Sequence, residues 1–575
     1  MLRLSNTDVA HLFEQIADLL EIEDASPFRV RAYRNAAATL RGLGREVRDM
    51  AAAGEPLTSL PGVGKDLASK ITEALDTGSI GALEALHQEV PPSLETLLRI
   101  PGLGPKRVRA LYQQLGILDL DDLRAAAEGG RIRSLRGFGV KTEQRLLEHL
   151  ADRREKKRRI PRHEARPHAE ALERHLAAVP GVEQVVVAGS YRRGRDTVGD
   201  LDLLVSAATP EAVMDGFTTF PAVAQVTALG PTRAAVVLRG GLQVDLRLVP
   251  PQSFGAALHY FTGSKAHNVR VRRLGQQRGL KVNEYGVFRG AERIAGDTEL
   301  SVFAAVGLPF IEPALREDRG EIEAALEGRL PHLVRRTDLR GDLHTHTTAS
   351  DGRASLRAMA EAALAAGLEY IAITDHAAEH GTGAQPMDAR RLQEQGEEID
   401  RLNQELKGIT LLKGVEVDIR EDGTLALPDT VLASLDLVVA SVHTATALPR
   451  RRQTDRLLRA MDHPVHILGH PGGRFRPERE GYAVDMETVM RRAAACGCAL
   501  ELNSQPRRLD LNETYCRLAR ERGVLLSIDS DGHGTESFAN LDDGILQARR
   551  SWLEPRHVLN TRPLAELRRL LRRHA

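Results

Sequence analysis

Residues 189–206 read Gly-Ser-Tyr-Arg-Arg-Gly-Arg-Asp-Thr-Val-Gly-Asp-Leu-Asp-Leu-Leu-Val-Ser, and this stretch decides how the middle of the chain folds. Because side chains alternate between the two faces of a β-strand, the carboxylates of Asp200 and Asp202 point to the same face. Two such carboxylates repel each other unless cations lie nearby, and their oxygens suit Mg²⁺, which shares its coordination shell with substrate phosphates. The Gly-Ser turn offers backbone N–H groups to a phosphate, and Arg192 and Arg193 add positive charge. The stretch therefore predicts a nucleotidyl-transfer site.

A third acidic residue lies on a second strand of alternating character, predicted over 243–249. Paired beside the first strand, this residue, Asp245, completes a three-carboxylate cluster that can hold two metal ions. One ion would lower the pKa of a primer 3′-hydroxyl, and the other would steady the triphosphate and the leaving pyrophosphate. An isolated Asp-x-Asp is most often a solvated pair at a strand end. The Gly-Ser turn and Asp245 favour the catalytic interpretation.

The length of 575 residues is too great for one hydrophobic core and predicts several domains. No apolar run approaches the length of a membrane span, and the N-terminus lacks a signal-peptide pattern, so we expect a cytoplasmic protein. The Cys496-Gly-Cys498 spacing is too tight for the usual zinc or redox motif. These cysteines and Cys516 are expected to be small buried residues.

Lysine and arginine together number 79, as do aspartate and glutamate, so the formal net charge is zero. The balance conceals a basic stretch made of Arg153, Arg154, Lys156, Lys157, Arg158, Arg159 and Arg162. Such a run is usually a solvated connector. Since this one separates two segments that both point to nucleic acid, contact with phosphates is an equal alternative.

Three similar turns precede the basic stretch, within an Ala-, Leu- and Arg-rich region of helical periodicity. They read Leu60-Pro-Gly-Val-Gly-Lys65, Ile100-Pro-Gly-Leu-Gly-Pro-Lys106 and Leu135-Arg-Gly-Phe-Gly-Val-Lys141. Each predicts a helix-hairpin-helix in which the glycines let a phosphate approach the N–H groups of the second helix and the lysine adds charge. One such turn is a weak signal, but three copies predict sequence-independent binding of the DNA backbone. The predicted DNA-binding residues are Gly62, Gly64, Lys65, Gly102, Gly104, Lys106, Gly137, Gly139 and Lys141.

The predicted catalytic strands are followed by Leu258-His-Tyr-Phe-Thr-Gly-Ser-Lys265 and then by a basic helix. Tyr260 and Phe261 are ordinary core aromatics or, as their place after the catalytic strands favours, flank a nucleotide sugar, where an aromatic edge can reject a 2′-hydroxyl. The hairpins, the Gly189–Gly194 turn, Gly199-Asp-Leu-Asp202, Asp245-Leu-Arg247 and this motif form an ordered set. On these motifs, residues 1 to about 318 resemble the family X DNA polymerases with a beta-like core.

The resemblance implies a small helical domain, fingers, palm and thumb, with Asp200, Asp202 and Asp245 as catalytic ligands of Mg²⁺ or Mn²⁺. It implies that Ser190 and Arg193 contact the triphosphate, the two aromatics the sugar and Asn268 the base edge. The full set of implied nucleotide-binding residues is Gly189, Ser190, Arg193, Gly199, Tyr260, Phe261, Gly263, Lys265 and Asn268.

Two lysines in this half of the chain, Lys265 and Lys70, have candidate roles of their own. Lys265 departs from the acidic residue that some family members have there, so we expect it to tighten nucleotide binding even with little metal. Lys70 falls where the 5′-deoxyribose-phosphate lyases of the family keep a Schiff-base lysine. A catalytic role and that of a phosphate-contacting or solvated lysine both stay open for Lys70.

After a predicted linker over 319–337, histidine and acidic residues recur at the ends of apolar runs. The stretch 338–346 predicts a strand with His344 and His346 on one face, where imidazoles at i and i+2 can ligate one metal. Apolar, β-branched runs that end in polar residues follow, separated by helical segments, and they predict a β/α repeat with its site at the carboxyl ends of parallel strands. The further candidate ligands are Asp351, His376, Glu416, His443, His470, Asp531 and His533.

This segment resembles the polymerase-and-histidinol-phosphatase domain, a distorted barrel of about seven β/α units that can hold three metals. The resemblance assigns the nine residues to one ion held by His344, His346, Glu416 and Asp531, a second held by Glu416, His443 and His470, and a third held by Asp351, His376 and His533. The set is intact and implies a phosphoesterase. Manganese suits mixed imidazole and carboxylate ligands, while zinc or iron also fit.

Together these signals predict a multidomain protein with all-α helix-hairpin-helix domains, an α+β nucleotidyltransferase palm with a thumb, and a distorted (β/α)7 barrel. The expected boundaries are 1–80 for a small lyase-like helical domain with the first hairpin, 81–151 for fingers with the other two, 152–251 for the palm, 252–318 for the thumb, 319–337 for a linker and 338–575 for the phosphoesterase.

The expected function is a DNA polymerase that fills short gaps in base excision repair. It is expected to carry its own metal-dependent 3′-to-5′ exonuclease, with cleavage at abasic sites as a further option. We expect a monomer that binds gapped or primed DNA and deoxynucleoside triphosphates, with no membrane partner. Two alternatives are a phosphoesterase whose polymerase half only docks DNA, and a non-enzymatic DNA-binding repair scaffold.

Overall fold

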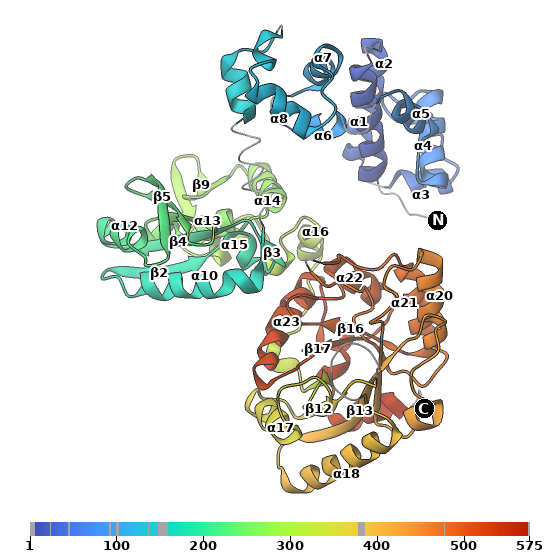
Figure 1. Cartoon of the computed structure of the whole chain (residues 1–575). Coiled ribbons are helices and arrows are strands. Elements are labelled where there is room, and N and C mark those ends of the chain that lie inside the picture. Colours follow the sequence, from blue (N-terminus) through green and yellow to red (C-terminus); the bar gives the residue numbers. More distant parts are fainter. Residues whose placement is uncertain are drawn as a thin grey trace. The chain divides into compact units, whose positions relative to one another are not determined.

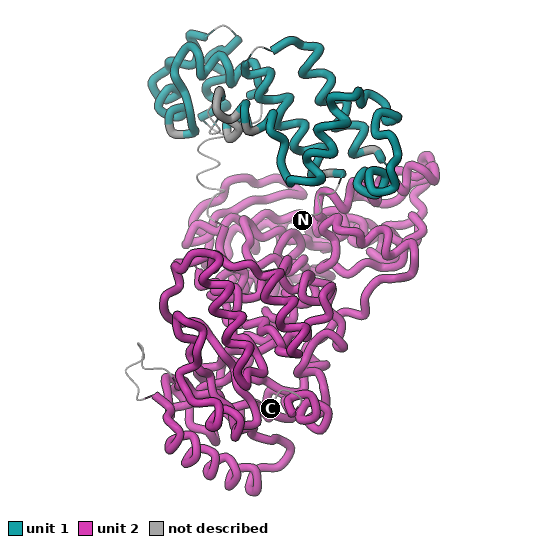
Figure 2. Tube along the Cα trace, turned by 90° about the vertical axis from the view of Figure 1, so that its right-hand side faces the viewer, with its two compact units in different colours: residues 1–158 teal, residues 159–575 magenta. Residues whose placement is uncertain are grey.

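The computed structural model describes residues 6–572 except 24, 44–45, 91–93, 99, 101–102, 136, 148–158, 378–385 and 477. The chain divides into two compact units, residues 1–158 and residues 159–575, each with its own hydrophobic core (Figure 2). Gly102 and five members of the basic stretch, Arg153, Arg154, Lys156, Lys157 and Arg158, lie outside the described residues.

The described part of unit 1 is helical. Its helices are α1 (Asn6–Ile22), α2 (Pro27–Gly42), α3 (Val47–Ala52), α4 (Lys65–Thr77), α5 (Gly81–Glu89), α6 (Leu94–Leu98), α7 (Pro105–Leu115), α8 (Leu120–Glu128) and one over 140–147. A single cluster of apolar side chains runs from Val9 to Leu146, so the predicted small domain and fingers share one core. Within it, Phe13 of α1 meets Tyr33 of α2 edge to face, with ring centroids 5.5 Å apart.

The three Gly-x-Gly turns repeat the same backbone hydrogen bonds. The residue between the glycines donates its N–H at 3.0 Å to the residue that opens the turn, in the pairs Val63 to Leu60, Leu103 to Ile100 and Phe138 to Leu135. The second glycine then accepts the first helical bond at 2.9–3.0 Å, in the pairs Ala68 to Gly64, Val108 to Gly104 and Glu143 to Gly139. The sequence repeat is therefore a structural repeat.

The first part of unit 2 holds a five-stranded mixed sheet of order β2-β4-β7-β6-β5. The strands are β2 (Val182–Val187), β4 (Asp200–Ala207), β5 (Val223–Leu229), β6 (Arg233–Leu238) and β7 (Gln243–Leu248), joined by the short pair β1 (Ile160–Pro161) and β3 (Thr197–Val198). β4 and β7 are parallel, and the other neighbours are antiparallel. The helices α10 (Arg162–Ala177) and α12 (Pro210–Thr218) share a core with one face of this sheet. On the other face, Leu204 packs against Phe254 and Ala257, so this face is only partly open.

A smaller helical layer follows the sheet. It contains α13 (Phe254–Thr262), α14 (Lys265–Gln277), α15 (Glu299–Ala305) and the antiparallel strands β8 (Lys281–Asn283), β9 (Gly286–Arg289) and β10 (Glu292–Ala295). The predicted linker contains α16 (Glu321–Leu326), and Oε1 of Glu321 lies 2.7 Å from Nδ1 of His267, with both side chains fully buried. The linker segment is thus packed on the thumb.

Seven parallel strands form the C-terminal barrel in the order of the chain (Figure 1). They are β11 (Gly341–Thr345), β12 (Tyr370–Ile373), β13 (Thr410–Asp418), β14 (Leu437–Ser441), β15 (Ile467–Leu468), β16 (Ala499–Asn503) and β17 (Leu526–Asp529). A parallel bridge between Thr345 and Gly532 brings the first strand to the last, so the barrel is nearly closed. The accompanying helices are α17 (Leu356–Ala365), α18 (Ala389–Glu405), α19 (Asp429–Leu432), α20 (Arg450–Ala460), α21 (Met486–Cys496), α22 (Glu513–Glu521), α23 (Leu541–Arg550) and α24 (Leu564–Leu571).

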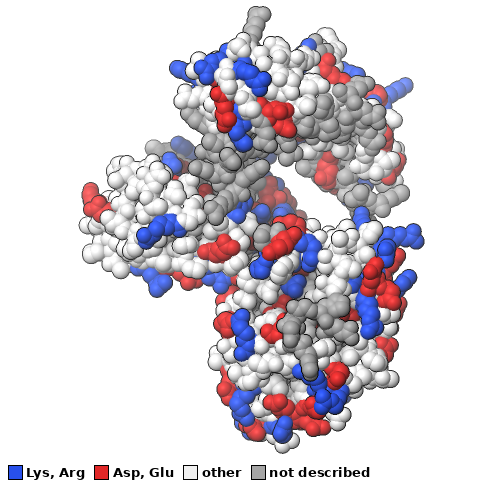
Figure 3. All heavy atoms as spheres, in the orientation of Figure 1, with Lys and Arg blue, Asp and Glu red and all other residues white. Residues whose placement is uncertain are grey.

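The sequence predicts no membrane span and three small buried cysteines. Among the described residues, no helix combines the length and the apolar character that a bilayer span requires. On the face drawn in Figure 3, lysine and arginine are interspersed with aspartate and glutamate over the barrel. Cys498 and Cys516 are buried, Cys496 is partly buried, and all three are free thiols.

Candidate active sites

The three predicted metal-binding carboxylates lie on the two parallel strands of the palm sheet. Asp202 on β4 is directly opposite Asp245 on β7, and Asp200 precedes Asp202 by two residues on the same face. Leu203 and Leu246 are buried in the core of the other face. Because a shift of one residue would exchange the two faces, burial of these leucines fixes the carboxylates on the open face.

The carboxylate cluster is short of positive charge. Burial, and then the neighbouring carboxylates of Asp200 and Asp245, raise the pKa of Asp202 to about 7. Oδ2 of Asp245 accepts a hydrogen bond from Gln243 at 2.8 Å, but its buried Oδ1 accepts none. Arg233 comes no nearer to Asp245 than 3.8 Å. Crowded carboxylates with an unpaired buried oxygen fit divalent cations.

The Gly-Ser turn passes directly over this cluster. Gly189 has a φ of +60°, and a Cβ built on it would lie 2.0 Å from Oδ2 of Asp202. Only glycine fits such an approach. Ser190 follows in the short helix α11 (Gly189–Arg192), whose first N–H groups have no partner within the helix. The turn therefore offers donors beside the carboxylates, where a triphosphate would meet both.

Arg192 forms an ion pair with a buried glutamate. Its two Nη atoms donate to the two carboxylate oxygens of Glu299 at 2.9 and 2.7 Å, and Nη1 also donates to the Thr262 hydroxyl at 2.8 Å. Burial raises the pKa of Glu299, but Arg192 and Arg316 outweigh that effect and lower it to about 2. The prediction that Arg192 adds charge to the phosphate site is wrong, because this bidentate pair ties the turn to α15 instead.

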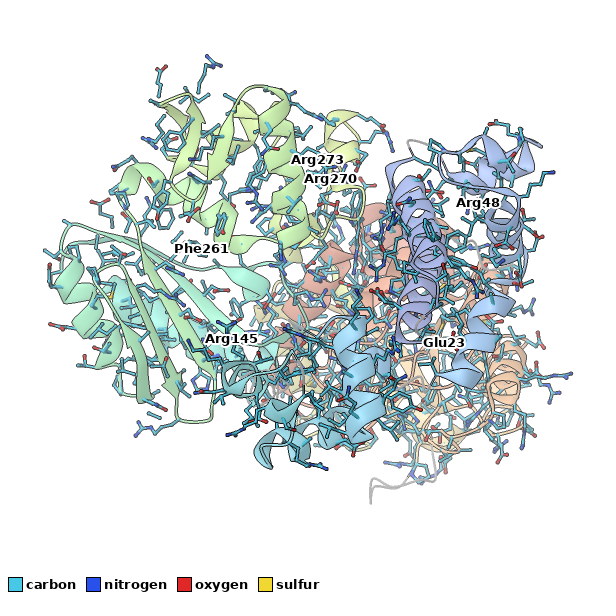
Figure 4. All side chains as sticks on the ribbon, turned by 90° about the horizontal axis from the view of Figure 1, so that it is seen from above. Glu23, Arg48, Arg145, Phe261, Arg270 and Arg273 are labelled. Atoms are coloured by element: carbon cyan, nitrogen blue, oxygen red, sulfur yellow. The ribbon has the colours of Figure 1, made fainter. Side chains whose placement is uncertain are left out.

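The predicted sugar and base contacts lie at the junction of α13 and α14. The side chain of Tyr260 is 36% exposed, its ring centroid lies 5.2 Å from that of Phe261, and the guanidinium of Arg247 lies 5.5 Å from the Phe261 ring. Figure 4 places Phe261 near the palm sheet and labels Arg270 and Arg273 on the neighbouring helix α14.

Two further predicted nucleotide contacts lie on α14. Lys265 is exposed as the first residue of the helix. Asn268 is buried, and its amide nitrogen donates to the carbonyl of Tyr260 at 2.7 Å. That bond braces the end of α13, and the buried amide oxygen of Asn268 has no hydrogen-bond partner.

In unit 1, the hairpin turns are open. A Cβ built on Gly64, Gly104, Gly137 or Gly139 would meet nothing within 4 Å, and on Gly62 it would meet Asn35 at 3.6 Å. Lys65, Lys106 and Lys141 are all exposed. The turns are therefore accessible to a phosphate backbone.

Lys70 lies on α4 and forms an ion pair with Asp66 one helical turn earlier. Burial lowers its pKa, but the bonds to Asp66 and Tyr33 outweigh burial and raise the pKa above the usual value for a lysine. A protonated ammonium cannot attack an aldehyde. The pairing therefore disfavours a Schiff base at neutral pH, and the lyase role stays a prediction.

The nine predicted ligands of the barrel converge at the carboxyl ends of its strands. They are His344 on β11, His346 directly after it, Asp351 in the loop that follows, His376 after β12, Glu416 on β13, His443 after β14, His470 after β15, and Asp531 and His533 after β17. Glu416 lies at the centre, since its oxygens are 3.0–3.5 Å from nitrogens of His344, His346, His376, His443 and His470. The structure thus brings all nine together.

Three subsets of these residues have ligand atoms within 4.8 Å of one another. They are His346, Asp351, His376 and His533; His344, His346 and Glu416; and His376, Glu416 and His443. Compared with the grouping that the resemblance implies, His346 joins the set of Asp351, and His376 the set of His443. Asp531 and His470 lie at the edges, with Asp531 3.2 Å from His346 and His470 3.2 Å from Glu416.

The chemistry of the cluster fits metal ions. Burial is the main cause that lowers the pKa of His346 to about 4 and that of His470 to about 3, which keeps both imidazoles neutral. Both ring nitrogens of His346, Nε2 of His344 and Oε2 of Glu416 are buried, and their close contacts with one another do not have hydrogen-bond geometry. Imidazoles and carboxylates gathered in this way are suitable ligands for divalent transition metals. His470 and Asp531 also hold strained positive φ values of 30° and 51°, as functional residues often do.

Sequence reasoning missed the acidic residues behind these ligands. Oε1 of Glu501 lies 2.7 Å from Nδ1 of His344, and its Oε2 accepts the N–H of His470 at 2.6 Å. Asp418 similarly lies 2.5 Å from Nδ1 of His443. Such partners fix which imidazole nitrogen is available to a metal. The available signal was a buried acid within an apolar strand, Ala499-Leu-Glu-Leu-Asn503.

Known protein families match this chain in five segments. The matching models are described as a helix-hairpin-helix domain over 5–80, a SAM-like helix-hairpin-helix tandem over 94–152, the DNA polymerase beta palm over 159–228, the DNA polymerase beta thumb over 257–317 and the PHP domain over 342–478. The polymerase and PHP matches include the carboxylates of β4 and the first ligands of the barrel.

Individual relatives repeat this division. Over 572 residues, covering 99% of both proteins, the chain is 38% identical to the DNA polymerase/3′-5′ exonuclease PolX of Bacillus subtilis. It is 28% identical to DNA polymerase lambda of Rattus norvegicus over 343 residues, 54% of this chain and 56% of the relative. A probable phosphatase of Thermoanaerobacter pseudethanolicus is 31% identical over 232 residues, 38% of this chain and 89% of the phosphatase.

Proposed function

Because this chain belongs to the family X DNA polymerases that carry a PHP domain, we propose that it fills short gaps during DNA repair and trims 3′ ends with its own nuclease. The observation that carries the polymerase half is the register of β4 and β7, which sets Asp202 beside Asp245 under the Gly189 turn. The observation that carries the nuclease half is Glu416 among five histidines.

At the palm site, Asp200, Asp202 and Asp245 would hold Mg²⁺ or Mn²⁺, which supplies charge to activate the primer hydroxyl and to stabilise pyrophosphate. The donors of Gly189 and Ser190 and the guanidinium of Arg193 would orient the triphosphate. Tyr260 and Phe261 would lie against the sugar, and the exposed ammonium of Lys265 would add attraction for the phosphates. The hairpin turns of unit 1 would hold the DNA backbone.

In the barrel, the nine ligands would hold up to three divalent ions, which supply a nucleophile and charge stabilisation for phosphodiester cleavage. Glu501 and Asp418 orient His344 and His443 by accepting their Nδ1 protons. We favour manganese because imidazoles and carboxylates are mixed, with zinc and iron as competitors. Cleavage at abasic sites would use the same ligands.

The experiment that tests both halves is primer extension and degradation on gapped DNA, with Mg²⁺ or Mn²⁺ and with or without nucleotides. We expect Asp245→Ala to abolish incorporation and keep degradation, and His344→Ala to do the reverse. Each variant is the other's control for folding. Loss of both activities in either variant contradicts the two-site assignment, degradation alone in the wild type supports a DNA-docking palm, and no activity at all supports a scaffold.

A further inference from the structure

The barrel contacts the turn that carries Arg193, the predicted triphosphate-binding residue of the polymerase. A Cβ built on Gly194, whose φ is +70°, would lie 3.2 Å from Leu546 and 3.7 Å from Arg550, both on α23. Nη1 of Arg550 donates to the carbonyl oxygen of Arg193 at 2.9 Å. A helix of the barrel thus packs on the turn and holds its main chain.

Arg550 and Arg193 also share one carboxylate. Nη1 of Arg550 lies 2.9 Å from Oε1 of Glu317, and Nε of Arg193 lies 3.0 Å from the same oxygen. The side chains of Arg550 and Glu317 are 2% and 13% exposed. Burial raises the pKa of Glu317, but the two guanidinium groups outweigh it and hold the pKa below its usual value. Glu317 is therefore an ionised, largely buried group that depends on its cations.

The other contacts of the two arginines differ. Nη1 of Arg193 donates to the carbonyl of Thr262 at 2.5 Å, beside the segment that joins α13 to α14. Nη2 of Arg550 instead donates to Glu513 of α22 at 2.5 Å. The guanidinium of Arg550 is thus also anchored within the barrel, whereas the guanidinium of Arg193 contacts Glu317 and Thr262, which lie outside the barrel.

A triphosphate that binds Arg193 must draw the guanidinium away from Glu317. With Arg550 in place, the carboxylate keeps a cation when Arg193 leaves. Without Arg550, the same step would leave Glu317 buried and unpaired, which is costly. We propose that Arg550 is a positioning residue of the polymerase nucleotide site, holding Glu317 so that Arg193 is available to the triphosphate; this rests on the polymerase function proposed above.

The test compares three full-length variants in gap filling. We expect Arg550→Ala to raise the KM for the incoming nucleotide about tenfold while kcat stays within about threefold. Adding Glu317→Gln to Arg550→Ala should restore most of the wild-type KM, because the competing carboxylate is gone. The matched control is Arg549→Ala on the same helix, whose guanidinium pairs with Glu312 at 3.2 Å and with the Val334 carbonyl, away from the turn.

The nuclease rate of each variant reports whether the barrel is folded. An unchanged KM in Arg550→Ala overturns the inference, and so does a double variant no better than Arg550→Ala, which would indicate loss of packing alone. A wild type that incorporates no nucleotide contradicts the proposed function instead. In that case, the equilibrium Kd of a fluorescent deoxynucleotide, measured in Ca²⁺ for the same proteins, decides the inference. We expect the Kd to rise in Arg550→Ala, to recover in the double variant and to stay unchanged in Arg549→Ala.

Discussion

The palm and the barrel hold two candidate metal sites of opposite construction. The palm cluster has three carboxylates on two neighbouring strands, and Asp200 is exposed. The barrel cluster has nine candidate ligands from β11 to beyond β17. Six are imidazoles, and five of these lie within 3.5 Å of the buried Glu416. Mg²⁺ is usually bound by one or two carboxylates together with substrate phosphates, whereas imidazole ligands suit transition metals. The contrast indicates a palm site completed by its nucleotide and a barrel site completed by the protein.

The largest effect that would sharpen this contrast is expected from Glu416→Gln. Because Glu416 contacts five imidazoles, we expect nuclease activity to fall by roughly 10³-fold or more. This loss is larger than the roughly 10–100-fold that follows removal of a residue that only orients a ligand. Metal content of the purified protein, measured by plasma mass spectrometry, should fall with it, while nucleotide incorporation stays. A variant with full metal content and full nuclease activity would remove Glu416 from the centre of the site.

A smaller loss is expected at the palm from Gly189→Ala. The methyl group would meet the Asp202 carboxylate, and a displacement of about 1 Å at a reacting centre costs on the order of 10²-fold in rate. The control is Gly279→Ala, whose φ of +69° imposes the same backbone strain but whose Cβ meets nothing within 4 Å. Gap-filling rates at saturating nucleotide decide the matter. Equal losses in the two variants would assign the effect to strain alone.

The next comparison concerns acidic residues that orient a ligand. In the barrel, Glu501 holds Nδ1 of His344, whereas the described palm cluster consists of carboxylates and has no such histidine–glutamate pair. We expect Glu501→Gln to lower the nuclease rate about 10–100-fold and to leave gap filling unchanged. Glu521→Gln, on the exposed side of α22, is the matched control. Wild-type nuclease activity in Glu501→Gln would mean that the orientation of His344 is set by its strand alone.

The smallest effect is expected at Lys70, the candidate Schiff-base lysine of a lyase. Since Asp66 and Tyr33 raise its pKa above the usual value for a lysine, the neutral amine is scarce at pH 7 and becomes more abundant as the pH rises. We expect weak borohydride trapping of a 5′-deoxyribose phosphate at pH 7, a rise with pH, and stronger trapping in Asp66→Asn. Trapping that is strong at pH 7 and survives in Lys70→Ala would place the nucleophile elsewhere.

Local patterns predicted more of this molecule than pairings across the chain did. The carboxylates of β4, the hairpin turns and the barrel ligands are each set by strand periodicity or by a short glycine motif. The partners of Arg192 and His344 are 107 and 157 residues away in sequence. A guanidinium in a basic turn looks the same whether it faces a phosphate or a buried glutamate, so sequence alone gave the wrong role for Arg192.

Trp552, directly after α23 and its C-terminal turn, is a member of the thumb's apolar cluster, together with Phe303 and Leu333. This placement constrains how such a gene can change during evolution. Deleting the barrel would uncover the thumb core, whereas replacing single ligands would leave that core intact. Loss of the nuclease by point substitution would therefore leave the polymerase core covered, whereas loss of the whole barrel would not.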